Sequence, residues 1–149
     1  MRTAFALALV TLGVGCAAPT VGPRVVSTPA APTAIGPYSQ AIRVGDTVWV
    51  AGQIGLDPET GRLVDGGIEA ETRASLEHVR SILEAAGLSL ADVVQTQVFL
   101  ADLGDFQKMN AVYATFFPTA PPARATVQVA GLPRGARVEV LATARRGRT

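Results

Sequence analysis

The side chains most able to do chemistry lie on two strands predicted near the C-terminus, at 123–129 and 137–144. In the first strand, the two-residue period places Arg124 and Thr126 on one face and small apolar residues on the other. In the second strand, Glu139 lies between two valines and faces away from them. If these strands pair as a hairpin with like faces aligned, Thr126 lies opposite Glu139 or two residues from it. An arginine and a carboxylate then share one polar patch, which is either a site for chemistry or a cross-strand ion pair on a solvated surface.

Two helices and further strands must position these side chains. The β-branched and aromatic residues after Asp46 predict a central strand, and Leu76, Val79 and Leu83 form a helical stripe that stops at Gly87. The expected elements are a strand at 47–54, a helix at 69–86, a strand at 93–100, a helix at 105–117 and the two C-terminal strands. This order predicts an α/β sandwich with the helices on one face of the sheet.

The second predicted helix carries one polar residue on an otherwise apolar face. Asp105 is the expected N-cap, and Phe106, Met109 and Tyr113 share the apolar face. Asn110 follows Phe106 by one turn and would need hydrogen-bond partners if it were buried.

Composition excludes several classes of function. The chain has 149 residues, enough for one domain with its own core, and 13 basic residues balance 12 acidic ones. That balance argues against a strongly electrostatic nucleic-acid binder. A single cysteine, Cys16, excludes an intramolecular disulfide and a cysteine-rich metal site, and a single histidine, His78, excludes a multi-histidine zinc site. With no second ligand or base nearby in the sequence, His78 is interpreted as a surface residue of the first helix.

The N-terminal 34 residues are expected to lie outside the folded domain. A short positive start precedes an apolar run at 4–14, which has the length of a signal-peptide core and is too short to span a bilayer. Residues 1–16 therefore predict an export signal, and Cys16 resembles the lipidated cysteine of bacterial lipoproteins, although Leu12 lies four residues before it rather than three. An ordinary secretory signal with an incidental Cys16 is the alternative. Residues 17–34 are rich in proline and alanine and predict an unpacked tether, followed by the domain at 35–149.

Six blocks of the remaining sequence resemble the RidA (YjgF) family of reactive-intermediate deaminases. The blocks are IGPYSQ at 35–40, AGQI at 51–54, EAAGL at 84–88, the helix at 105–117, PAR at 122–124 and VEV at 138–140. They occur in the family's order over about residues 34–146. The resemblance implies a chorismate-mutase-like α/β subunit with a mixed sheet, assembled as a homotrimer with sites at the subunit interfaces.

The resemblance also implies roles for particular residues. Arg124 matches the arginine that holds the substrate carboxylate, a task that suits a planar, permanently charged guanidinium. Glu139 matches the glutamate that positions or activates the attacking water. The positions expected to bind substrate are Tyr38, Gly52, Asn110 and Thr126.

Three positions depart from the family pattern. Thr126 stands where many members have cysteine, Ala51 where some have serine, and Leu141 where some have a second acidic residue. Because the hydrolysis needs no thiol nucleophile, we expect the threonine to be neutral for activity and the other two changes to remove hydrogen bonds to the substrate.

The activity implied is hydrolysis of enamines and imines, such as 2-aminoacrylate, to 2-keto acids and ammonia, with neither metal nor organic cofactor. The predicted export signal would separate the protein from the cytosolic enzymes that release such intermediates. The alternative is therefore a non-catalytic trimer of the cell envelope that captures a small carboxylate, attached to the membrane through Cys16 or free in the periplasm. Nucleic-acid binding or ribonuclease activity is a third reading, which the charge balance and the predicted export disfavour.

Overall fold

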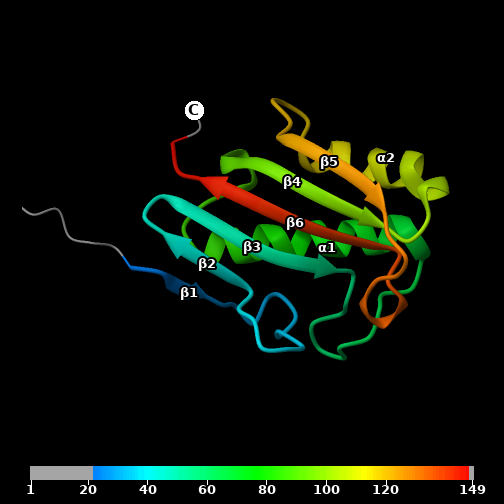
Figure 1. Ribbon diagram of the computed structural model, residues 1–149, viewed down its shortest axis with the longest axis horizontal. Coiled ribbons are helices and arrows are strands. Elements are labelled where there is room, and N and C mark those ends of the chain that lie inside the picture. The colour runs from blue at the N-terminus through cyan, green and yellow to red at the C-terminus, as the bar shows by residue number, and fades with distance from the viewer. Residues whose placement is uncertain (1–21, 148–149) are drawn as a thin grey trace, which may run out of the picture.

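Six strands form one mixed sheet, and both long helices pack on the same face of it (Figure 1). The structure is a computed structural model that describes residues 22–147. Along the sheet the strands lie in the order β1-β2-β3-β6-β4-β5, and only β4 and β5 run parallel to each other. The elements are β1 (Arg24–Val26), β2 (Ala41–Val44), β3 (Thr47–Ile54), α1 (Gly67–Ala85), β4 (Val93–Leu100), α2 (Phe106–Phe116), β5 (Ala123–Gln128) and β6 (Val138–Arg145). The predicted α/β sandwich is confirmed.

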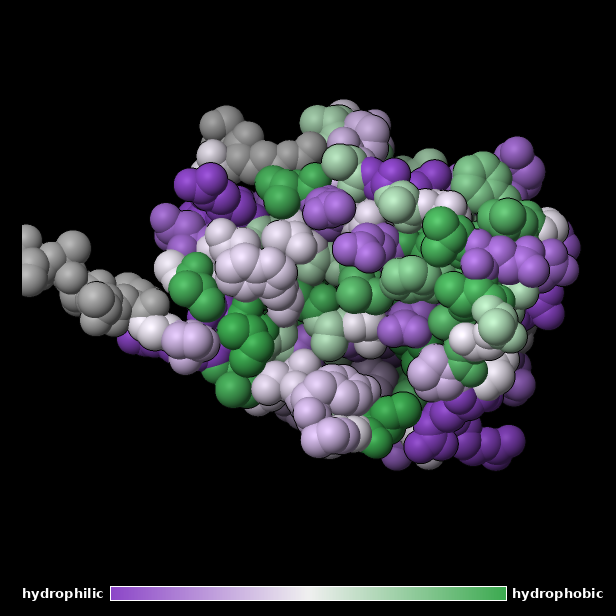
Figure 2. Space-filling view, viewed as in Figure 1, coloured by the Kyte–Doolittle hydropathy of each residue, from purple (hydrophilic) through white to green (hydrophobic). Residues whose placement is uncertain are grey.

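The core lies between the sheet and the two helices. On β6, Val138 and Val140 are fully buried toward the helices, whereas Glu139 between them points to the opposite face. On α1, the predicted stripe of Leu76, Val79 and Leu83 is fully buried. The face of the sheet that carries Glu139 has no helix of the described chain on it (Figure 1), and Figure 2 shows apolar side chains exposed among hydrophilic ones on that face. The alternating strand pattern therefore leaves one face for the core and one open.

The hairpin expected from the two C-terminal strands does not form. β6 lies between β3 and β4, and β5 pairs with the other edge of β4. The parallel register aligns Thr96 with Arg124, and Thr96 is buried on the helix side. The antiparallel register aligns Phe99 with Glu139 on the open side. Arg124 and Glu139 therefore lie on opposite faces of the sheet in one chain, and the prediction of a shared polar patch is wrong. The reason is topological: α2 crosses over between β4 and β5 and makes them parallel neighbours, which a period of two does not reveal.

The expected tether is partly folded. Residues 24–26 form β1, which pairs antiparallel with β2, and Ala31 is buried. The buried amide of Gln40 organises the turn that follows: its Nε2 donates to the carbonyls of Thr28, Ala31 and Pro32 at 3.1, 3.1 and 2.8 Å. This segment is ordered by side-chain hydrogen bonds and not by a periodic pattern of apolar residues, so the periodicity of its sequence does not predict that it is folded. The predicted signal at 1–16 and Cys16 lie outside the described residues.

His78 is buried rather than on the surface. Only 4% of the residue is exposed, and its Nδ1 has no hydrogen-bond partner in the part of the chain that the structure describes. α1 buries a second strip beside the leucine stripe, which contains Glu71, Thr72, Ser75 and His78. Gly55 lets the chain after β3 pass close to α1, because a Cβ on residue 55 would overlap the backbone of Glu71. Burial lowers the pKa of His78, and the nearby Ile54 carbonyl opposes that effect.

Candidate functional site

Arg124 projects from β5 into a pocket formed with α2. One guanidinium nitrogen, Nη2, donates a hydrogen bond to Oδ1 of Asn110 at 2.7 Å. The guanidinium carbon lies 4.5 Å from the centre of the Tyr113 ring and 5.9 Å from that of Phe106. The adjoining cavity has a volume of about 490 Å³ and is lined by Asn110, Tyr113, Ala114, Phe117, Pro121, Pro122 and Arg124. This arrangement holds a cation beside a cavity of the size that a small organic molecule needs.

Two of the residues expected to bind substrate, Asn110 and Thr126, lie on the same side of the sheet as Arg124. Asn110, which the sequence singled out as a polar residue on an apolar face, accepts from Arg124. Thr126 lies on the same face of β5, and its buried Oγ1 has no hydrogen-bond partner among residues 22–147. A free hydroxyl beside a held arginine can accept or donate a hydrogen bond to a ligand.

Tyr113 is a part of this site that the sequence did not assign to it. The residue is 5% exposed, and its hydroxyl shares a 2.7 Å hydrogen bond with Oγ1 of Thr96. Burial raises the pKa of Tyr113, while the Thr96 hydroxyl and the Arg124 charge act in the opposite sense. The sequence showed Phe106, Asn110 and Tyr113 at spacings of four and three, which place them on one helix face. The spacing predicts the shared helix face, but it does not indicate that this face lies against Arg124.

Glu139 lies with Gly52 on the opposite face of the sheet. A Cβ on Gly52 would overlap the carboxylate of Glu139, so only glycine leaves room for that side chain. The pairing of β3 with β6 shifts register between Val50 and Gln53, which places Gly52 inside the irregularity. Burial raises the pKa of Glu139, and no cation of the described chain pairs with its carboxylate. A half-buried carboxylate with a raised pKa is suited to accept a proton from a water molecule.

A charged network fixes the end of the sheet from which β6 begins. Oε2 of Glu71, on α1, accepts a hydrogen bond from the backbone N–H of Arg137 at 2.8 Å. The guanidinium of Arg137 donates twice to Oδ2 of Asp105, at 3.0 and 2.7 Å. The sequence predicts Asp105 as the N-cap of α2. Asp105 does precede the helix, but its side chain binds Arg137 and makes no capping hydrogen bond. The network ties both helices to the strand that carries Glu139.

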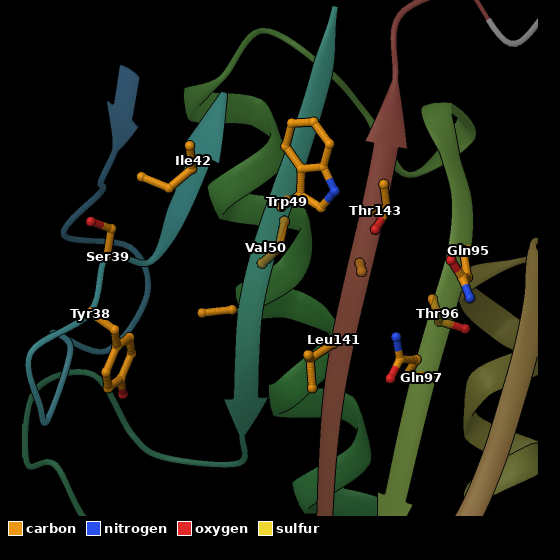
Figure 3. A pocket seen from close by; sticks show the side chains of 12 residues that line it. Tyr38, Ser39, Ile42, Trp49, Val50, Gln95, Thr96, Gln97, Leu141 and Thr143 are labelled. Atoms are coloured by element: carbon orange, nitrogen blue, oxygen red, sulfur yellow. The ribbon is translucent and has the colours of Figure 1, made fainter. Parts of the chain in front are cut away.

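Tyr38 comes from the loop before β2 and borders the open face. It is 48% exposed, and its hydroxyl accepts a hydrogen bond from the N–H of Ile35 at 3.2 Å. A cavity of about 390 Å³ lies along this face, and Figure 3 shows Tyr38, Trp49 and Leu141 around it. Ala51 lines the same cavity, so two of the three departures from the family pattern lie here.

The candidate residues thus form two groups in one chain. Arg124, Asn110 and Thr126 lie on the helix side, at the edge of the sheet formed by β5. Glu139, Gly52 and Tyr38 lie on or beside the open face. Within residues 22–147, no group of three or more histidine, cysteine or acidic side chains is arranged to hold a metal ion. The described residues also contain no helix with the length and apolarity needed to cross a membrane.

Comparison with known proteins identifies the family. Residues 28–146 match the family described as Endoribonuclease L-PSP. The chain is 51% identical over 124 residues to the 2-iminobutanoate/2-iminopropanoate deaminase of Mus musculus, covering 83% of this chain and 92% of the mouse protein. The chain therefore belongs to this family, which includes RidA and YjgF, and the resemblance seen in its sequence blocks is confirmed.

Solved structures of the family share the fold. RidA from Psychrobacter sp. PAMC 21119 is 45% identical and superposes with a TM-score of 0.79, covering 82% of this chain and 98% of that one. E. coli TdcF with bound serine is 41% identical, also with a TM-score of 0.79, and the match covers 83% of this chain and 98% of TdcF.

Proposed function

We propose that this protein hydrolyses small 2-imino acids, and the enamines from which they form, to 2-keto acids and ammonia. The observation that carries the proposal is the setting of Arg124: neutral partners hold its guanidinium beside a cavity of about 490 Å³. A guanidinium held in this way can bind the carboxylate of an imino acid through two parallel hydrogen bonds. The mouse relative's name supports the same substrate class.

We propose further that the working unit is a homotrimer in which each site lies between two subunits. Arg124 and Glu139 are on opposite faces of the sheet, so one chain alone cannot apply both to one small substrate. The open face also carries apolar side chains that a partner would cover, with Trp49 47% and Val127 46% exposed. If the edge of one subunit that carries Arg124 packs against the open face of the next subunit, Arg124 and Glu139 come together in one site. The same contact covers the exposed apolar side chains of that face.

In the proposed reaction, Arg124 anchors the carboxylate and Glu139 accepts a proton from water. The water oxygen forms a bond to the carbon of the C=N group, and the nitrogen takes up a proton to give a tetrahedral aminol. Glu139 returns the proton that it took from water, so that the nitrogen of the aminol is an amino group. The hydroxyl proton then moves to this nitrogen through the same carboxylate, the C–N bond breaks, ammonia leaves, and the carbon keeps the oxygen as a ketone. Positioning and one general base contribute about 10²–10⁴-fold, which is sufficient for imines that already react with water.

The test generates imino acids with an amino-acid oxidase, traps them with semicarbazide and measures how much trapped product the protein removes. We expect the wild-type protein to lower trapping and Arg124→Lys to lose most of this effect, because lysine cannot donate two parallel hydrogen bonds or stack on Tyr113. Wild-type protein that binds a keto acid without lowering trapping would instead support the alternative function, a non-catalytic carboxylate-binding protein. Equal turnover by Arg124→Lys and wild type would contradict the anchoring role.

We also propose that residues 1–16 direct export and that Cys16 is lipidated. The support is the order of a positive start, an apolar run and a small-residue segment around the cysteine. The full-length protein expressed in a bacterial host should then fractionate with membranes, and Cys16→Ser should move it to the soluble periplasmic fraction. Wild-type and Cys16→Ser proteins that fractionate alike would contradict lipidation.

A further inference from the structure

The Arg124 guanidinium contacts three neutral groups, the Asn110 amide and the rings of Tyr113 and Phe106. A guanidinium has five N–H donors, and its hydrogen bond to the Asn110 amide uses one of them. The two ion pairs in residues 22–147 join Arg80 to Glu77 and Arg137 to Asp105, so neither involves Arg124. Within residues 22–147 no ion pair therefore neutralises its charge, which an anionic ligand can do.

The ring of Tyr113 supplies the surface on which this guanidinium rests. Arg124 lies 4.5 Å from the centre of that ring, within the range of a favourable cation–π contact. The ring is almost completely buried, so it supports Arg124 from the protein side and leaves the cavity side free. Phe117 packs against Tyr113 with 4.7 Å between ring centres, which limits movement of the ring.

Thr96 fixes Tyr113 and is itself the neighbour of Arg124. Its Oγ1 lies 2.7 Å from the Tyr113 hydroxyl, and β4–β5 pairing places Thr96 directly beside Arg124. The three residues therefore close a triangle of one backbone pairing, one hydrogen bond and one ring contact. Such a triangle fixes the position of the guanidinium relative to the sheet, where a flexible arginine would otherwise sample several rotamers.

We infer that Tyr113, held by Thr96, is a positioning residue that sets the orientation of Arg124 for the substrate carboxylate. Tyr113 acts through Arg124 and does not itself need to touch the substrate. This inference rests on the proposed function and adds a specificity element to it: the platform favours ligands that carry a carboxylate over neutral ketones or imines of the same size. A preorganised donor pair improves affinity because less freedom is lost on binding.

The experiment measures binding of 2-oxobutanoate, a stable keto acid, to the assembled protein, with butanone as the uncharged control ligand. Tyr113→Leu removes the ring and should weaken 2-oxobutanoate binding about tenfold, with little change for butanone. Tyr113→Phe keeps the ring but loses the bond to Thr96, and should weaken binding about two- to threefold. In the deaminase assay the loss should appear mainly in KM, because the carboxylate contact exists in both ground state and transition state.

The same helix offers a matched control. Phe116 also lies under an arginine, with the Arg80 guanidinium carbon 5.0 Å from its ring centre, and it is 7% exposed. Phe116→Leu should lower thermal stability by an amount similar to Tyr113→Leu and leave 2-oxobutanoate affinity unchanged. A merely structural role for Tyr113 predicts instead that the two variants behave alike in both measurements.

A double-mutant cycle keeps the inference testable if Tyr113→Leu does not fold. Thr96→Val and Tyr113→Phe each remove one side of the same hydrogen bond, so the double variant should bind 2-oxobutanoate no more weakly than either single variant. Additive losses, or wild-type affinity in all three, would overturn the inference. Wild-type protein that binds 2-oxobutanoate through this platform but leaves imino acids untouched would overturn the proposed function alone.

Discussion

Gly52 and Glu139 share a space that only one side chain can occupy. A Cβ on Gly52 would overlap the Glu139 carboxylate, so the glycine is needed to accommodate that side chain on the open face. Arg124 depends on its neighbours in the same way, through Asn110 and Tyr113. At the scale of residues, the position of each candidate catalytic side chain therefore depends on a neighbouring residue: Gly52 for Glu139, and Asn110 and Tyr113 for Arg124.

We predict that Gly52→Ala lowers kcat/KM about 100-fold, because a methyl group displaces the Glu139 carboxylate by an ångström or more. Gly131→Ala is the matched control, since a Cβ at Gly131 meets no atom within 4 Å. That control should keep wild-type kinetics. Equal activity in Gly52→Ala and Gly131→Ala would contradict a catalytic role for the Glu139 carboxylate at the position beside Gly52.

Glu139 should impose an acid limb on the pH profile. Burial raises its pKa above the usual 4.5, and a general base works only when ionised. After subtraction of the uncatalysed reaction, kcat/KM should rise with pH through a midpoint above 4.5 and then level off. Glu139→Gln should show low activity without that midpoint, whereas a wild-type profile that is flat from pH 4.5 upward would remove Glu139 as the base.

At the scale of elements, the sequence predicted all the long helices and strands of the core, but not their neighbours in the sheet. Periods of two and of about 3.6 residues show which side chains share a face, and this located β6 and α1 correctly. The order of strands in the sheet depends instead on the crossover through α2 and on hydrogen bonds between strands that are far apart in the sequence, such as β3 and β6. For this reason Arg124 and Glu139 were recognised individually and placed wrongly with respect to each other.

α1 also contains His78, which the sequence places on the surface and the structure buries, and this has a consequence for stability. The pKa of His78 is lowered in the folded protein by burial. The unfolded chain therefore takes up a proton as pH falls through about 6.5, while the folded chain resists doing so. The contribution of His78 to stability is complete above that pH and is lost progressively below it.

We predict that the free energy of unfolding of the wild-type protein falls more steeply than that of His78→Gln as pH is lowered from 8 to 5. Urea titrations at a fixed protein concentration measure this difference, and the other titrating groups are common to both proteins. Because His78 is the only histidine in the chain, no second imidazole complicates the comparison. Parallel pH curves for the two proteins would contradict the burial of a neutral His78.

At the scale of the whole molecule, the folded unit begins earlier than its composition indicates. β1 extends the sheet at one edge, and Gln40 binds three carbonyls of the segment between β1 and β2. In Figure 1 the start of β1 and the end of β6 lie at the same end of the sheet. The N-terminal segment is thus part of the packed structure from Arg24 onward.

A protein that starts at Ile35 should be less stable than one that starts at Gly22, by about 2 kcal/mol or more, because the Gln40 amide loses its partners and β2 becomes an edge strand. Urea unfolding of the two proteins at equal concentration measures the difference. Gln40→Ala in the longer protein should reproduce part of the loss. Equal midpoints for the two starting points would show that residues 22–34 contribute nothing to folding.

The central claim is that Arg124 of one subunit and Glu139 of another act on one substrate. It is tested most directly by coexpressing Arg124→Ala and Glu139→Ala chains, each inactive alone, and measuring imine hydrolysis by the mixed assembly. With random mixing in a ring of three, each interface has about one chance in four of joining an intact Arg124 to an intact Glu139, so about a quarter of wild-type activity should return. No activity in mixed trimers that form normally would contradict a site shared between subunits.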